Sequence, residues 1–115
     1  MRRGEIRLVD LEPVRGNEAN KRRPAVLVSN DQANAIADRL GRGVITVVPL
    51  TSNLDRVFPF QALFPAAVSG LRIDSKAQAE QIRSVAVERV GPVLGRVPPE
   101  LMRDVDEALR LHLQL

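Results

Sequence analysis

A short polar stretch holds the side chains that are best suited to chemistry in this sequence. It carries Glu18 and three consecutive cations that end at Arg23, and Pro24 then opens an apolar run. Binding and catalytic groups commonly lie on such a loop at the mouth of a rigid element. A carboxylate near a guanidinium suits a phosphodiester substrate, because one group can move a proton while the other neutralises charge. The alternative interpretation is a solvated loop with an exposed basic run.

The residue types that the chain lacks narrow this chemistry. It has no Cys, Trp or Tyr, and His112 is its single histidine. A cysteine nucleophile, a disulfide, a two-histidine ribonuclease mechanism and a histidine-rich metal site are therefore excluded. We expect His112 to be a helix-surface or core-edge residue. Any chemistry must then come from Arg, Glu, Asp, Ser, Thr or the backbone, and we expect no metal or other cofactor.

Length and composition predict one basic domain over residues 1–115. Hydrophobic residues make up 44% of the 115, which is enough for a packed core. All but two of the 17 basic residues are arginine, which grips phosphate in a planar fork, so a small anionic or nucleic-acid partner fits. Because there is no apolar run long enough to span a bilayer and no signal-peptide segment, we expect a cytoplasmic protein that does not bind a membrane.

A second polar cluster follows the strongest strand signal of the chain. Residues 44–50 predict a strand, and Thr51, Ser52 and Asn53 come directly after it. If this strand neighbours the one that Pro24 begins, the two polar clusters can meet at one end of the sheet. Thr51 could then donate a hydrogen bond to a phosphate oxygen beside Arg23. Alternatively, Thr51 only caps its strand and Arg23 only pairs with Glu18.

The remaining pattern indicates a small, strongly bent sheet with helices. Strands are expected over residues 5–11, 24–29, 44–50, 60–64, 75–79 and 80–87, with Pro24 at the first position of its strand and a bulge between the last two. Helices are expected over residues 31–40 and from residue 98 to the C-terminus. Lys76 and Glu80 could line the same surface as the two polar clusters. The fold class is mainly β with short helices, of the open-barrel type.

Three motifs in this order resemble the MazF/PemK family of toxin–antitoxin ribonucleases. They are Arg3-Gly4-Glu5 with Gly16-Asn17-Glu18 and Arg23-Pro24, then Pro49-Leu50-Thr51-Ser52, then Glu80-Gln81-Ile82-Arg83-Ser84. The C-terminal helix matches as well, so the resemblance covers nearly the whole chain. Two positions depart from the family pattern. An aromatic residue is missing near Ile6, which bears on the dimer surface or on base stacking, and Asn17 replaces a common Ser, which bears on base choice.

This resemblance implies an SH3-like small barrel, similar to CcdB and MazF, with a C-terminal helix. It implies a homodimeric toxin that cleaves single-stranded RNA at specific sequences without a metal, leaving 2′,3′-cyclic phosphate and 5′-hydroxyl ends. The implied protein partner is a cognate antitoxin that occupies the RNA groove. The family's catalytic residues fall on Glu18, Arg23 and Thr51. Residues that resemble its RNA-binding set are Asn17, Ser52, Asn53, Glu80 and Gln81.

Other interpretations remain beside this one. Lys21 and Arg22 are expected to steer phosphate, or else to be solvated charge. A non-catalytic toxin like CcdB, which resembles this fold and acts by binding gyrase, is the alternative function. A barrel that binds RNA without cutting it fits less well, because the chain has only three Phe for base stacking.

Overall fold

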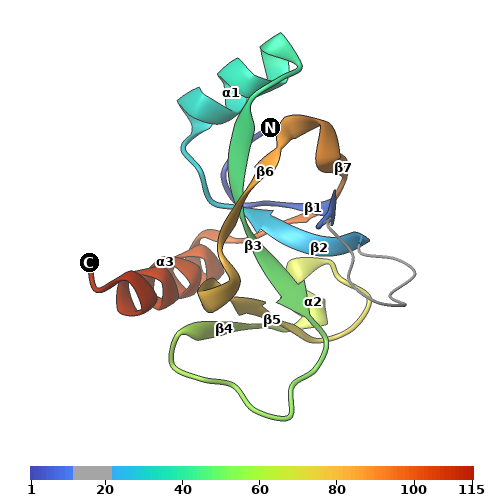
Figure 1. The fold of residues 1–115 in the computed structure, drawn as a ribbon. Coiled ribbons are helices and arrows are strands. Elements are labelled where there is room, and N and C mark those ends of the chain that lie inside the picture. Colours follow the sequence, from blue (N-terminus) through green and yellow to red (C-terminus); the bar gives the residue numbers. More distant parts are fainter. Residues whose placement is uncertain (12–21) are drawn as a thin grey trace, which may run out of the picture.

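The computed structural model describes residues 1–11 and 22–115 (Figure 1). The predicted site residues Asn17, Glu18 and Lys21 therefore lie outside the described residues. The elements are β1 (Glu5–Asp10), β2 (Arg22–Leu27), α1 (Asp31–Leu40), β3 (Val44–Thr51), β4 (Gln61–Phe64), α2 (Ala66–Ser69), β5 (Ser75–Gln78), the 3-10 turn η1 (Ala79–Gln81), β6 (Arg83–Ala86), the 3-10 turn η2 (Val87–Arg89), β7 (Val90–Arg96) and α3 (Pro99–Leu113).

The strands form one antiparallel sheet that bends sharply around β3. The order is β4-β5-β3-β2-β1-β7, and β6 pairs with β3 outside this path. One edge of β3 serves two strands, because Val47 pairs with Arg83 of β6 whereas Thr51 pairs with Lys76 of β5. The chain turns a corner at η1 between these two strands. The predicted mainly β fold with a C-terminal helix is confirmed, and the described sheet is not closed, since β4 and β7 do not pair.

The two central strands are buried on both faces, as their continuous apolar sequences predict. Val26 of β2 and Val48 of β3 belong to the core that α3 covers. Leu27 follows Val26 on β2, and Val47 precedes Val48 on β3. Both belong to the other core, which includes Ala37 of α1. Burial on both faces fixes the backbone of β2 and β3, so the residues at their ends start from a rigid base.

Helix α1 begins and ends as the sequence predicts, and both ends of α3 lie within two residues of the predicted ends. Asn30 caps α1, because its side chain accepts a hydrogen bond from the backbone N–H of Ala33 at 2.8 Å. Gly41 ends α1 with a φ of 66°. Helix α3 begins at Pro99 and buries one apolar face on the sheet, and His112 lies exposed near its end. Within the described stretches, no helix has the length and apolar character needed to cross a bilayer.

Strand β7 is the main element that the sequence does not predict. Gly91, Pro92 and Gly95 all disfavour a strand, yet β7 pairs along β1. Gly95 is needed because a Cβ atom there would lie 2.6 Å from the carbonyl oxygen of Ser69 at the end of α2. The prediction for Pro24 was also wrong, since it is the third residue of β2. Its missing N–H is tolerated because the pairing of β2 with β3 begins only at Ala25.

Candidate functional site

The antiparallel pairing of β2 with β3 brings the two predicted polar clusters to the same end of the sheet. Ala25 pairs with Pro49, so the start of β2 lies beside the end of β3. Arg23, Thr51 and Ser52 consequently line one pocket. The condition that the sequence left open, that these two strands are neighbours, is met.

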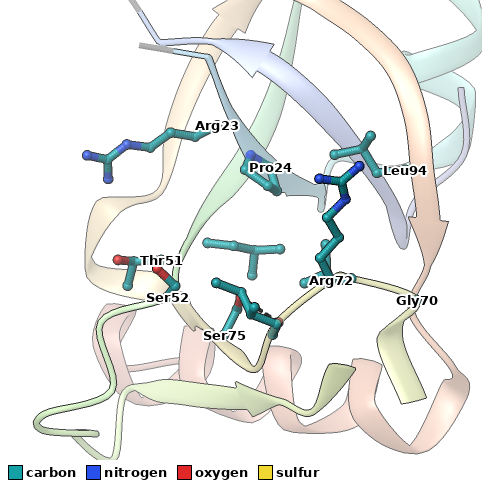
Figure 2. A pocket seen from close by; sticks show the side chains of 11 residues that line it. Arg23, Pro24, Thr51, Ser52, Gly70, Arg72, Ser75 and Leu94 are labelled. Carbon is teal, nitrogen blue, oxygen red and sulfur yellow. Dashed lines mark hydrogen bonds between the residues drawn. The ribbon is translucent and has the colours of Figure 1, made fainter. Parts of the chain in front are cut away.

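The pocket has a volume of about 610 Å³ and four walls (Figure 2). They come from the start of β2, the end of β3, the segment between α2 and β5, and β7. The lining residues are Arg23, Pro24, Leu50, Thr51, Ser52, Gly70, Leu71, Arg72, Ile73, Ser75 and Leu94. None of these residues is acidic, so the charges of the described lining are the two guanidinium groups of Arg23 and Arg72. The pocket therefore favours an anionic ligand.

Arg23 presents its guanidinium from a fixed backbone. The residue pairs with Val9 of β1, while its side chain is exposed and extends on the same side of the pocket as Thr51 (Figure 2). Among the described residues, none forms an ion pair or hydrogen bond with this guanidinium. The proposed pairing partner Glu18 lies outside the described residues. The Arg23 side chain is thus available to a phosphate within the described part of the pocket.

Thr51 is the last residue of β3 and lines the same pocket. Its Oγ1 accepts a hydrogen bond from the backbone N–H of Asn53 at 3.3 Å, so the hydroxyl proton can still be donated to a ligand. Asn53 itself does not line the pocket, and its side chain accepts from the N–H of Asp55 at 3.0 Å. The hydroxyl of Thr51 can therefore serve both the local turn and a bound anion.

The other predicted RNA-binding residues that the structure describes lie outside this pocket. Glu80 and Gln81 belong to η1, and Arg22 is the first residue of β2. The Glu80 Oε2 atom accepts a hydrogen bond from Nε2 of Gln61 at 2.8 Å, and Oε1 is buried with no partner among the described residues. Gln81 is exposed. Their contact with RNA stays a prediction.

Glu80 and Lys76 instead form hydrogen bonds that stabilise the loop between β3 and β4. Gln61, which Glu80 binds, accepts a hydrogen bond from the N–H of Phe58 at 3.0 Å through its Oε1. Lys76 Nζ donates to the carbonyl oxygen of Arg56. The sequence suggests that Lys76 could line the surface of the site, but the residue does not line the pocket and is only 7% exposed. Lys76 thus contacts the loop between β3 and β4 directly, and Glu80 contacts it through Gln61.

The wall formed by residues 70–73 and Leu94 is the part of the pocket that the sequence does not predict. Residues 70–73 lie in a segment without periodicity, and Leu94 belongs to the unpredicted β7. Arg72, the second cation of the pocket, comes from this wall. The one available signal is an isolated arginine between two apolar residues in a turn, which is too common to indicate a site.

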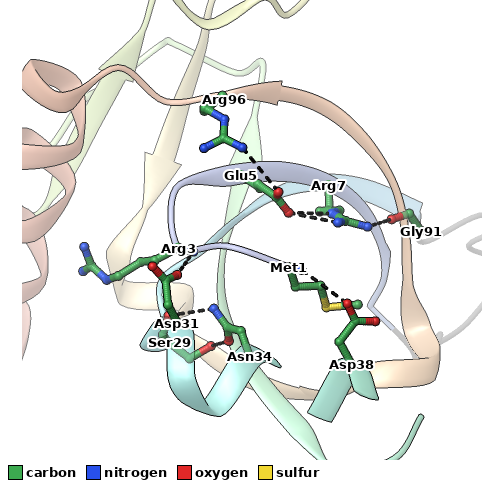
Figure 3. A network of polar contacts seen from close by, with 10 residues as sticks. All are labelled: Met1, Arg3, Glu5, Arg7, Ser29, Asp31, Asn34, Asp38, Gly91 and Arg96. Carbon is green, nitrogen blue, oxygen red and sulfur yellow. Dashed lines mark hydrogen bonds and ion pairs between the residues drawn. The ribbon is translucent and has the colours of Figure 1, made fainter. Parts of the chain in front are cut away.

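A separate polar network ties β1 to β7 (Figure 3). Glu5 is 7% exposed, and its Oε1 atom binds Arg7 through Nε at 3.0 Å and Nη2 at 2.9 Å. The Oε2 atom lies 3.6 Å from Nη2 of Arg96, and Arg7 Nη1 donates to the carbonyl oxygen of Gly91 at 3.1 Å. Burial raises the pKa of Glu5, but a backbone hydrogen bond at Arg2 and the Arg7 guanidinium outweigh it, and the pKa lies below its ordinary value.

The lowered pKa of Glu5 makes the stability of the fold depend on pH. A carboxyl group with a depressed folded-state pKa stabilises the protein above its unfolded pKa, which is about 4.3 for Glu, and this contribution is lost as the pH falls through the folded-state value. We expect Glu5→Gln to lower the free energy of unfolding by about 1–3 kcal/mol at neutral pH and by clearly less in acid. Urea denaturation at several pH values measures this. Glu100→Gln, at an exposed carboxylate on α3, is the control, and an equal pH dependence of both variants would contradict the assignment.

Known proteins resemble this chain both in sequence and in fold. A family model described as "PemK-like, MazF-like toxin of type II toxin-antitoxin system" matches residues 2–113. The chain is 64% identical over 115 residues to endoribonuclease MazF9 of Mycobacterium tuberculosis, covering 100% of this chain and 98% of that protein. It is 29% identical over 116 residues to endoribonuclease EndoA of Bacillus subtilis, with 100% and 96% covered. A solved mycobacterial endoribonuclease in complex with its cognate antitoxin superposes with a TM-score of 0.76 at 26% identity, covering 100% of this chain and 96% of that one.

Proposed function

This chain belongs to the PemK-like, MazF-like family of type II toxin–antitoxin toxins, and we propose that it cuts single-stranded RNA at specific sequences without a metal ion. The endoribonuclease class is supported by the 64% identity to MazF9 over the whole length. One observation carries the proposal for the site. Arg23 and Thr51, which come from neighbouring strands, line one pocket whose described charges are both cationic.

The chemistry follows from the substrate, because RNA carries its own nucleophile. The 2′-hydroxyl oxygen attacks the adjacent phosphorus and loses its proton, the bond from phosphorus to the 5′ oxygen breaks, and that oxygen gains a proton. The products are a 2′,3′-cyclic phosphate and a 5′-hydroxyl. Arg23 neutralises the charge of the phosphorane, and Thr51 donates a hydrogen bond to one of its oxygens. We assign the removal of the 2′-hydroxyl proton to Glu18.

Arginine can replace a metal ion as the source of positive charge at the phosphate. A divalent cation would need carboxylates or similar oxygen ligands, whereas the described lining of the pocket offers two guanidinium groups. The structure of a relative with its cognate antitoxin supports an antitoxin partner for this chain as well. A homodimer and a cytoplasmic location stay predictions from the family resemblance and the composition.

Exposure of a long RNA to the purified protein in EDTA tests this function. We expect a limited set of fragments, whose 5′ ends carry a hydroxyl and can be sequenced only after phosphorylation by a kinase. The sequenced ends also give the cleavage motif. Cleavage that stops in EDTA and returns with Mg²⁺ would contradict the metal-independent mechanism but keep the nuclease. No cleavage of any RNA, with inhibition of gyrase supercoiling instead, would favour the CcdB-like alternative.

A further inference from the structure

We propose that Arg72 binds a second phosphate of the RNA strand, across the pocket from Arg23, and that the base between the two phosphates lies on the apolar floor. Arg72 can take this role only if the chain cuts RNA as proposed above. On this path the RNA strand continues from Arg23 and Thr51 across the pocket toward Arg72.

The charge of Arg72 is available to a ligand. The side chain is exposed, and none of the described residues forms an ion pair or hydrogen bond with it. Asp74, the acidic residue that follows closely in the sequence, is engaged elsewhere, since its Oδ1 atom accepts a hydrogen bond from the backbone N–H of Ala66 at 2.8 Å. Figure 2 shows Arg72 beside Leu94, on the opposite side of the pocket from Arg23. Two arginines whose side chains have no described partner thus line one cavity.

The surface between the two arginines suits a nucleobase. The apolar lining residues include Leu50, Leu71 and Ile73, which can contact the flat face of a base, and Ser52 and Ser75 add hydroxyl groups to the lining. A volume of about 610 Å³ lies within the range of sites that hold small organic ligands. A base on an apolar surface with a phosphate at each end matches this arrangement of side chains.

The wall that carries Arg72 is held in place before any ligand binds. Ser69, at the end of α2, is 2% exposed and its Oγ atom donates to the carbonyl oxygen of Pro65 at 2.9 Å. The same Oγ accepts a hydrogen bond from the N–H of Leu71 at 3.3 Å. On the other side, Gly95 lets β7 approach the carbonyl of Ser69 closely. A binding group on a fixed wall loses little conformational freedom on binding, which favours affinity.

Phosphate is a better match to this pair of cations than the carboxylate of an acidic peptide. Each guanidinium can bind a phosphate through two parallel hydrogen bonds, and successive phosphates occur at regular intervals along a strand. The same strand must also bring one phosphate to Arg23 and Thr51, which lie in the same pocket. A single RNA strand satisfies both requirements at once.

The kinetics of Arg72 variants test this inference with short RNA substrates that contain the cleavage motif. We expect Arg72→Ala to raise KM by about tenfold with little change in kcat, and to reduce the salt dependence of binding by about one phosphate contact. Arg72→Glu should raise KM further, and Arg72→Lys should restore part of it. Arg42→Ala, at an exposed cation just beyond α1, is the matched control. Trimming the substrate nucleotide by nucleotide should abolish the difference between wild type and Arg72→Ala once the second phosphate is gone.

The possible failures are distinguishable. If the wild-type protein cuts no RNA, the proposed function is wrong and the role of Arg72 falls with it. If the wild type cuts normally and Arg72→Ala behaves like Arg42→Ala, only the role of Arg72 is wrong. If Arg72→Ala weakens antitoxin binding but leaves KM for RNA unchanged, the residue serves the protein partner, and the proposal for RNA is overturned. Circular dichroism of each variant verifies that the fold is retained.

Discussion

Arg23→Ala is expected to lower kcat for RNA cleavage by about 10²–10³-fold, the loss that follows removal of one charge-stabilising donor from an active site. The fold should survive, because the Arg23 side chain is exposed and contacts no described partner, while the backbone pairing with Val9 does not depend on the side chain. Single-turnover cleavage of a short RNA measures the effect on chemistry, and thermal denaturation measures the stability.

Two further variants separate charge from geometry at this position. Arg23→Lys keeps the positive charge but loses the planar fork, so we expect it to recover only a small part of the lost rate. Arg39→Ala removes an exposed cation from α1 and should cut RNA like the wild type. Near-normal cleavage by Arg23→Ala would remove this residue from the mechanism, whereas equal losses in Arg23→Ala and Arg39→Ala would indicate that only the overall charge matters.

Thr51→Val is expected to lower kcat by about 10–10²-fold, because valine keeps the shape of threonine but cannot donate a hydrogen bond to the phosphorane. Thr51→Ser keeps the hydroxyl and should retain most of the activity. Loss of the hydrogen bond from the N–H of Asn53 should also cost about 1 kcal/mol of stability. Single-turnover rates and urea denaturation distinguish the catalytic effect from the structural one.

Thr46→Val is the matched control for this substitution. Thr46 lies on the same strand, where it pairs with Ser84 of β6, and it does not line the pocket. We expect its substitution to leave the cleavage rate unchanged. If Thr51→Val keeps the wild-type rate and loses only stability, the hydroxyl is a strand-end cap and has no part in catalysis.

The sequence predicts those helices and strands whose local pattern of apolar and capping residues matches their burial in the fold. Strands β2 and β3 read as continuous apolar runs because both of their faces are covered, and α1 carries its own cap at Asn30 and its own stop at Gly41. Strand β7 has no such signal. Its glycines are required because backbone atoms of β1 and α2, which are distant in the sequence, approach them closely. Local propensity does not record these contacts and therefore predicts no strand there.

The same limit applies to the candidate site. The meeting of Arg23 with Thr51 can be predicted, because it needs only that two strong strands are neighbours and antiparallel. The hydrogen bond from Gln61 to Glu80 and the position of Arg72 across from Arg23 arise from tertiary packing. No periodicity or spacing in the chain records these contacts. Motif comparison assigns Glu80 to RNA binding, which stays a prediction, but it does not record the hydrogen bond that Oε2 of Glu80 accepts from Gln61 of β4.

Strands β2 and β3 contribute side chains to both cores, and this affects how the protein unfolds. Each core takes alternate side chains of these two strands, with Val26 and Val48 on one side and Leu27 and Val47 on the other. If either core unfolded alone, one face of both strands would be exposed to water while the other face stayed packed. We therefore expect local opening to be confined to the periphery, and the two cores and the pocket at the end of β3 to unfold in one cooperative transition.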